Sequence, residues 1–183
     1  MTGRRPSGAS ERDRPTPDVG SAVEIALHYL GARPRTRWEL ERRLRRTSAS
    51  EEVIAGAMER LARLGYLDDT AFARWWAEQR DRHSPRGRRM VEAELRQRGV
   101  PREVLEAMRG SELSEPGLDD EILPGSEAER ARIALDRHMK GRPLPDDVKA
   151  LQRIGAFLMR RGFDPETVRA TLRAAVRDDS VES

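Results

Sequence analysis

Hydrophobic residues recur every three or four positions along most of this chain, which is the spacing of helices that bury one face. The clearest stripe is followed by a helix-ending glycine, Gly65, and consists of Val53, Ile54, Ala57, Met58, Leu61 and Leu64. Shorter stripes with the same period lie before and after it. The pattern predicts nine short helices and no strand, so we expect an all-α chain.

The starts of several predicted helices carry capping residues. Ser84 followed by Pro85 is typical of an N-cap and a first helical residue, and it predicts the start of the fifth helix. Asp68 and Asp69 are expected to cap the fourth helix, because acids there satisfy free N–H groups; a catalytic carboxylate pair is the weaker interpretation. Two other starts have the capping-box spacing: Thr36 with Glu39, and Ser126 with Glu129.

The helical pattern repeats along the chain. Leu95-Arg-Gln-Arg-Gly-Val-Pro-Arg-Glu-Val104 is matched by Leu158-Met-Arg-Arg-Gly-Phe-Asp-Pro-Glu-Thr-Val168, which is one residue longer. Each copy has a helix end with arginine, a glycine stop, an apolar residue and a restart assisted by proline. Leu44 to Val53 has the spacing of the first copy without its glycine. These matches predict tandem repeats of three-helix modules that form an elongated, curved body; the alternative is one nine-helix globule.

The domain boundaries follow from this repeat and from two segments poor in apolar residues. Residues 1–20 are rich in Pro, Gly and Ser and predict a disordered N-terminal tail. Residues 111–125 combine acids with Pro and Gly and predict an acidic linker. We expect module 1 at 21–65, module 2 at 66–110, module 3 at 126–177, and a C-terminal tail at 178–183.

Composition narrows the class of protein. Of the 183 residues only 4% are aromatic, which argues against a β-sandwich or barrel. The absence of cysteine excludes disulfides and thiolate chemistry. The chain has no apolar run of transmembrane length and no apolar signal-peptide core, so we expect a cytoplasmic protein.

The sequence gives little support to an enzyme. His28, His83 and His138 are too far apart in sequence for a metal-ligand motif, and no phosphate-binding loop or nucleophile motif is present. We therefore predict no catalytic residue, no metal and no cofactor.

Arginine supplies the main candidate chemistry. The chain has 33 Arg and 2 Lys against 32 acids, and the acids concentrate in residues 111–129, which contain 7 acids and no basic residue. Arginines recur at matching places in the modules and could line up as a basic stripe that binds phosphates. The alternative is that each one pairs with a nearby Glu or with a helix C-terminus. The predicted stripe consists of Arg42, Arg43, Arg46, Arg86, Arg88, Arg89, Arg160 and Arg161.

The three tryptophans have two interpretations. Trp38, Trp75 and Trp76 could stack on nucleic-acid bases. Their apolar neighbours favour core positions instead, and since Trp75 and Trp76 are adjacent, one of them is expected to be only partly buried.

Several of these segments resemble the RecX family, whose members regulate the RecA recombinase. Ala26–Leu40 is similar to the opening module of that family, and Leu64-Gly-Tyr-Leu-Asp-Asp-Thr-Ala-Phe-Ala73 is similar to its most recognisable motif. Ser84–Val100 and Phe157–Phe163 resemble two later blocks, in the family's order. The resemblance covers roughly residues 22–177; the long acidic linker and the N-terminal tail depart from it.

The resemblance implies a non-catalytic protein of tandem three-helix repeats. RecX-like proteins lie in the groove of the RecA filament on single-stranded DNA and reduce its ATPase, strand-exchange and coprotease activities. The expected partners are therefore the RecA filament and single-stranded DNA, in DNA repair by homologous recombination and the SOS response, and we expect a monomer. Two other functions fit the residues: a general nucleic-acid-binding helical-repeat protein independent of RecA, and a protein-interaction scaffold whose arginines pair with acidic partners.

Overall fold

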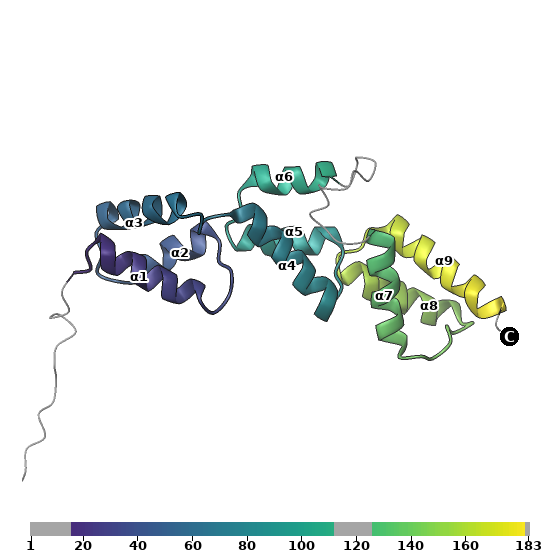
Figure 1. Cartoon of the computed structure of the whole chain (residues 1–183). Coiled ribbons are helices and arrows are strands. Elements are labelled where there is room, and N and C mark those ends of the chain that lie inside the picture. The colour runs from purple at the N-terminus through teal and green to yellow at the C-terminus, as the bar shows by residue number, and fades with distance from the viewer. Residues whose placement is uncertain (1–15, 112–125, 182–183) are drawn as a thin grey trace, which may run out of the picture. The chain divides into compact units, whose positions relative to one another are not determined.

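The computed structural model describes residues 16–111 and 126–181, and the regular secondary structure in this part of the chain consists of α-helices (Figure 1). The all-α prediction is confirmed, and the described part contains no strand. Residues 112–125 of the acidic linker predicted at 111–125, and residues 1–15 of the predicted N-terminal tail, lie outside the described residues. Ser111 belongs to a helix, as do Val19 and Gly20. The helices are α1 (Val19–Leu30), α2 (Arg37–Leu44), α3 (Glu51–Arg63), α4 (Asp69–His83), α5 (Arg88–Gln97), α6 (Arg102–Ser111), α7 (Glu127–Met139), α8 (Val148–Arg160) and α9 (Pro165–Val181).

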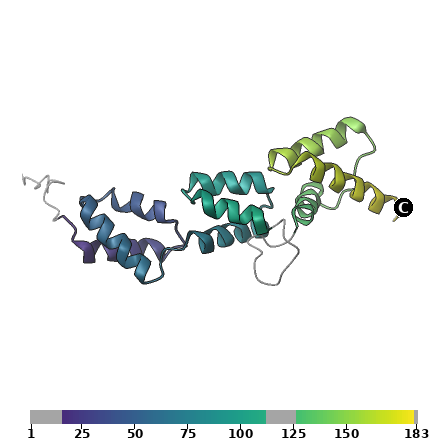
Figure 2. The same ribbon diagram turned by 90° about the horizontal axis from the view of Figure 1, so that it is seen from above.

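The helices belong to two compact units. The first unit contains the described residues up to Arg33 together with Glu39–Leu67, and the second contains Pro34–Trp38 and the described residues from Asp68 onward. The short segment Pro34–Trp38 leads into α2 and includes its first two residues, but it belongs to the second unit. Within each unit the helices lie against one another in groups of three, as Figure 2 shows for α4, α5 and α6.

The core of the first unit is formed by α1, α2 and α3. Small residues, including Ala22, Ala26 and Ala57, are fully buried and allow α1 and α3 to pack closely. The apolar stripe predicted for α3 is confirmed at Ile54, Ala57, Met58 and Leu61, which are buried. Val53 is only partly buried, and Leu64, the C-cap, is 56% exposed. The larger side chains that fill this core are Leu40, Leu44, Ile54, Met58 and Leu61.

The second unit contains two separate cores, one for each of its groups of three helices. Between α4, α5 and α6 the core includes Phe72, Trp76, Leu95 and Met108. Between α7, α8 and α9 it includes Ala131, Ala134, Leu158, Phe163 and Val168. Leu95 and Leu158, which open the two matched sequence segments, are both completely buried.

The two matched segments also share their backbone geometry. After α5 the N–H of Val100 donates to the Leu95 carbonyl at 3.1 Å, and after α8 the N–H of Phe163 donates to the Leu158 carbonyl at 3.4 Å. Each turn passes through a glycine with positive φ, +75° at Gly99 and +91° at Gly162, where a glycine avoids steric strain. The repeated sequence therefore encodes the same helix ending twice.

Each of these helix ends receives a segment from earlier in the chain. The hydroxyl of Thr36 donates to the Arg98 carbonyl at 2.6 Å, and the backbone N–H of Gly87 donates to the Arg161 carbonyl at 2.9 Å. Thr36 lies in Pro34-Arg-Thr-Arg37 and Gly87 in Pro85-Arg-Gly-Arg88, so similar short motifs make both contacts.

The capping predictions are confirmed at two starts. Asp68 is the N-cap of α4 and accepts from the N–H of Ala71 at 2.8 Å, as predicted. Ser126 accepts from the N–H of Glu129 at 3.1 Å at the start of α7.

The prediction for Ser84 and Pro85 is wrong. Ser84 is the C-cap of α4, Pro85 is buried, and α5 starts only at Arg88 after Gly87 as its N-cap. The physical reason is the contact with Arg161, which holds this segment extended as a connector.

The last helix extends further than predicted. α9 continues to Val181 and includes four residues that were predicted to belong to the C-terminal tail, because no Gly or Pro interrupts the helix there.

Candidate interaction surface

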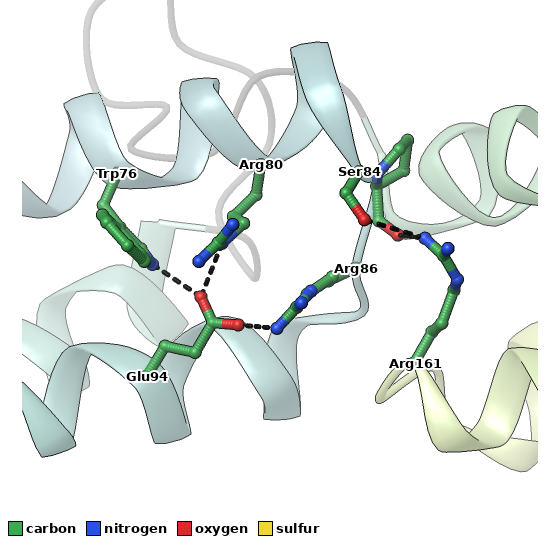
Figure 3. Close-up of polar contacts among 7 residues, drawn as sticks. Trp76, Arg80, Ser84, Arg86, Glu94 and Arg161 are labelled. Atoms are coloured by element: carbon green, nitrogen blue, oxygen red, sulfur yellow. Dashed lines mark hydrogen bonds and ion pairs between the residues drawn. The ribbon is translucent and has the colours of Figure 1, made fainter.

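Glu94 is the centre of a polar cluster between α4 and α5 (Figure 3). Its carboxylate accepts from the indole N–H of Trp76 at 2.8 Å and from Nε of Arg80 at 2.6 Å, and it forms an ion pair with Arg86. Only 13% of the Glu94 side chain is exposed, so these bonds are largely screened from water. Arg80 also lies 4.3 Å from the centre of the Trp76 ring. The cluster fixes the segment before α5 to the body of α4 and α5.

The arginines of this cluster are held close together. Burial lowers the pKa of Arg86, and the positive charges of Arg80 and Arg161 lower it further. Burial also lowers the pKa of Arg80. Glu94 is the carboxylate that compensates Arg80 and Arg86, which makes it important for the stability of the second unit.

Arg161 joins α8 to the connector between α4 and α5. Its guanidinium group donates to the hydroxyl of Ser84 and to the carbonyl of Pro85, both at 3.1 Å (Figure 3). The same group lies 4.9 Å from the centre of the Phe157 ring. Arg161 and Arg86, both predicted for the basic stripe, therefore make contacts inside the protein.

Arg88 also makes contacts inside the second unit. Its backbone N–H donates to Glu127 at 3.3 Å, and its side chain lies 4.0 Å from the carboxylate of Glu92. Burial raises the pKa of Glu127, although the N–H and the charge of Arg88 oppose that increase. Arg88 thus links the start of α5 to the start of α7.

The other predicted stripe residues have more exposed side chains. Arg46, Arg89 and Arg160 are exposed, and no side-chain partner is found for them among the described residues. Arg42 is exposed as well, and Arg43 lies 5.9 Å from the ring centre of Tyr29. Among the eight predicted residues, Arg86, Arg88 and Arg161 therefore hold parts of the second unit together, whereas the side chains of Arg46, Arg89 and Arg160 are exposed to solvent.

The two tryptophans of α4 pack in or against the core, as their apolar neighbours predict. Trp76 is 8% exposed and belongs to the core, whereas Trp75 packs against it and is only partly buried, as expected for adjacent helical residues. Trp38 is 39% exposed. Arg98 stacks over Trp76 at 3.7 Å. This contact could not be predicted from the sequence, because the pairing depends on the packing of α4 against α5.

The described part of the chain contains no group of three His, Asp or Glu side chains placed to hold a metal ion. None of its helices has the length and apolar character needed to cross a bilayer. The features that stand out are arginines and their carboxylate partners, which suit binding to an anionic or mixed-charge surface.

Comparison with known proteins agrees with this arrangement. The sequence matches the first three-helix domain of RecX over residues 22–61, the second over residues 68–108 and the third over residues 126–172. It is 34% identical to the regulatory protein RecX of Chlorobaculum tepidum, over 89% of this chain and 93% of that protein. It is 33% identical to the regulatory protein RecX of Mycolicibacterium vanbaalenii, over 86% of this chain and 84% of that protein.

A solved structure shows the same fold. The crystal structure of RecX from Lactobacillus salivarius superposes with a TM-score of 0.69 at 19% sequence identity, covering 86% of this chain and 96% of that chain. The three domain matches, in the order of the family and on an all-helical fold, confirm the resemblance seen in the sequence. The chain belongs to the RecX family of regulatory proteins.

Proposed function

We propose that this protein is a cytoplasmic regulator, mainly an inhibitor, of the RecA recombinase. It binds in the groove of the RecA filament on single-stranded DNA and reduces ATP hydrolysis, strand exchange and coprotease activity. The observation that carries the proposal is the ordered match of all three RecX domains over most of the chain. Regulation here occurs by binding and not by a chemical reaction.

The arrangement of the arginines supports this proposal. A filament groove presents both protein and DNA phosphates, and exposed guanidinium groups can bind carboxylates or phosphates with two parallel hydrogen bonds. Arg46, Arg89 and Arg160 have their side chains exposed for such contacts. Arg86 and Arg161 contribute indirectly, because they hold the connector from which α5 begins.

The test is the single-stranded-DNA-dependent ATPase of RecA from the same organism, titrated with this protein while DNA is in excess. We expect the ATPase rate to fall at protein concentrations below that of RecA, since one bound molecule affects several RecA subunits. An unchanged ATPase rate, with the protein shown to be folded and to bind DNA, would refute the proposal and favour a nucleic-acid-binding protein independent of RecA.

A further inference from the structure

A second candidate site lies within the second unit, on a surface that the predicted stripe does not include. Between α5 and α6 there is a hollow of about 430 Å³. The residues that line it are Arg96, Val100, Arg102, Leu105, Glu106 and Arg109. Three of these six side chains are arginines, and two are apolar residues of the adjacent core.

The charge of the hollow is unbalanced. Glu92, which is 7% exposed, receives two hydrogen bonds from Arg109 at 2.8 and 2.5 Å. The same carboxylate lies 4.0 Å from Arg96, so two guanidinium groups of the hollow share one carboxylate. A single carboxylate can fully compensate only one of these cations, and the surface keeps a positive excess.

The remaining arginine is paired loosely. Arg102 contacts Glu106 at 2.6 Å, but 85% of its side chain and 50% of that of Glu106 are exposed. Exposed pairs of this kind contribute only about 0–1 kcal/mol. Arg102 can therefore exchange Glu106 for an acidic group of a partner with little loss of stability.

We propose that this hollow, here named the α5–α6 groove, binds an acidic peptide segment that carries an apolar side chain between its acids. Arg102 and Arg109 are seven residues apart on α6, roughly 10 Å along the helix axis. Two carboxylates separated by two helical turns would match them, and an apolar side chain between the two would lie over Val100 and Leu105. The partner is a protein and not a nucleic acid, because no aromatic ring lines the groove for base stacking and the apolar side chains of Val100 and Leu105 suit an apolar side chain of a peptide.

This proposal is independent of the regulation of RecA, and its test uses the full chain alone. The probe is a short, fluorescently labelled helical peptide with two glutamates two turns apart and leucine between them, and binding is measured by fluorescence anisotropy. We expect saturable binding that weakens with salt. We also expect the double variant R96E/R102E to bind about tenfold more weakly or worse.

The matched control is R132E/R169E, which makes the same charge change at exposed arginines of α7 and α9, outside the groove. Circular dichroism establishes that both variants keep their helical content. Unaltered peptide binding by the control supports the proposal, whereas an equal loss in both variants shows a nonspecific charge effect and overturns it.

Two further measurements separate the groove from simple charge attraction. A peptide with serine in place of leucine should bind more weakly; equal binding would overturn the role of the apolar floor. An oligothymidylate should bind R96E/R102E as well as it binds the control variant. Selective loss of oligothymidylate binding in R96E/R102E would assign the groove to nucleic acid and overturn the proposal.

Discussion

A Cβ atom placed on Gly99 would lie 2.4 Å from the Cβ of Trp38. Trp38 stands at the start of α2, and Gly99 ends the turn after α5, so residues 61 positions apart meet without space for a methyl group. The neighbouring Thr36 hydroxyl bonds the Arg98 carbonyl in the same place. Gly162 repeats the relationship, since a Cβ there would lie 2.5 Å from the Cβ of Met90.

The first prediction concerns Gly99→Ala. An alanine at position 99 would have to adopt a positive φ, and its Cβ would clash with the Trp38 side chain. An alanine at position 141 would adopt a similar φ of +73°, but no atom lies within 4 Å of its Cβ. Both glycines belong to the second unit. We expect Gly99→Ala to lower the free energy of unfolding by about 1–3 kcal/mol more than Gly141→Ala does. Thermal unfolding followed by circular dichroism measures the difference, and equal losses would show that Trp38 moves aside without cost.

The glycines at the two repeated helix ends show which parts of this fold could be predicted from the sequence. The helical periodicity, the buried stripe of α3 and the repeated Leu–Gly segments were all present in the sequence because each depends on local spacing. The contact partners of Gly99 and Gly162 could not be predicted in this way, since Trp38 and Met90 lie in the first turns of α2 and α5, far away in the sequence. For the same reason the Ser84–Pro85 pair was misread as a helix start: its local signal was a cap, but its actual partner is Arg161, 76 or 77 residues away.

The second prediction concerns Glu94→Gln. This change keeps the shape of the side chain but removes the negative charge shared by Arg80 and Arg86, which leaves two partly buried cations uncompensated. We expect a loss of about 1–3 kcal/mol in the free energy of unfolding. Glu106→Gln is the control, because its partner Arg102 is exposed, and we expect it to change stability by less than about 1 kcal/mol. Urea unfolding of both variants measures the difference in the free energy of unfolding. Similar losses would show that the Glu94 cluster stabilises the protein no more than an exposed ion pair does.

The third prediction concerns Asp81 and pH. Burial raises the pKa of Asp81 from 3.8 to about 6, although the charge of Arg130 opposes the increase. The Oδ2 atom of Asp81 is buried without a hydrogen-bond partner among the described residues. Since the folded protein holds this proton more tightly than the unfolded chain, ionised Asp81 lowers stability above about pH 6, and that loss is recovered as the pH falls toward 3.8.

Asp81→Asn should therefore be more stable than the unchanged protein at pH 7.5, by about 1–3 kcal/mol. The difference should shrink between pH 6 and pH 4, because the unchanged protein becomes protonated there and the variant has no group to titrate. Melting temperatures of both proteins across this pH range provide the measurement. A variant less stable than the unchanged protein at pH 7.5 would show that the attraction between Asp81 and Arg130 outweighs the cost of burial.

The candidate site was predictable only in part. The sequence shows that Arg86 and Arg89 lie near the start of a helix, but nothing local distinguishes them. The difference arises in three dimensions: Arg86, in the connector before α5, forms an ion pair with Glu94 on α5, eight residues later, whereas Arg89 remains exposed. A list of arginines taken from sequence therefore mixes structural ion pairs with charges available to a partner.

The last prediction separates these two kinds of arginine. The triple variant R46E/R89E/R160E changes three exposed residues without a side-chain partner in the described part of the chain. We expect it to keep its melting temperature within a few degrees, because surface substitutions of this kind change stability by about 0.5 kcal/mol or less each. We expect it to lose most of its inhibition of the RecA ATPase, since each reversal replaces an attraction for phosphate or carboxylate with a repulsion.

The paired variant is R86E/R161E, which places two acids beside Glu94 and removes the bonds from α8 to Ser84 and Pro85. It should lower the melting temperature strongly, and any loss of inhibition should accompany that loss of structure. Measuring stability and RecA ATPase for both variants distinguishes the two roles. If the triple variant inhibits RecA fully, the exposed arginines are not the contact residues. If R86E/R161E keeps the original melting temperature, the assignment of Arg86 and Arg161 to structural contacts is wrong.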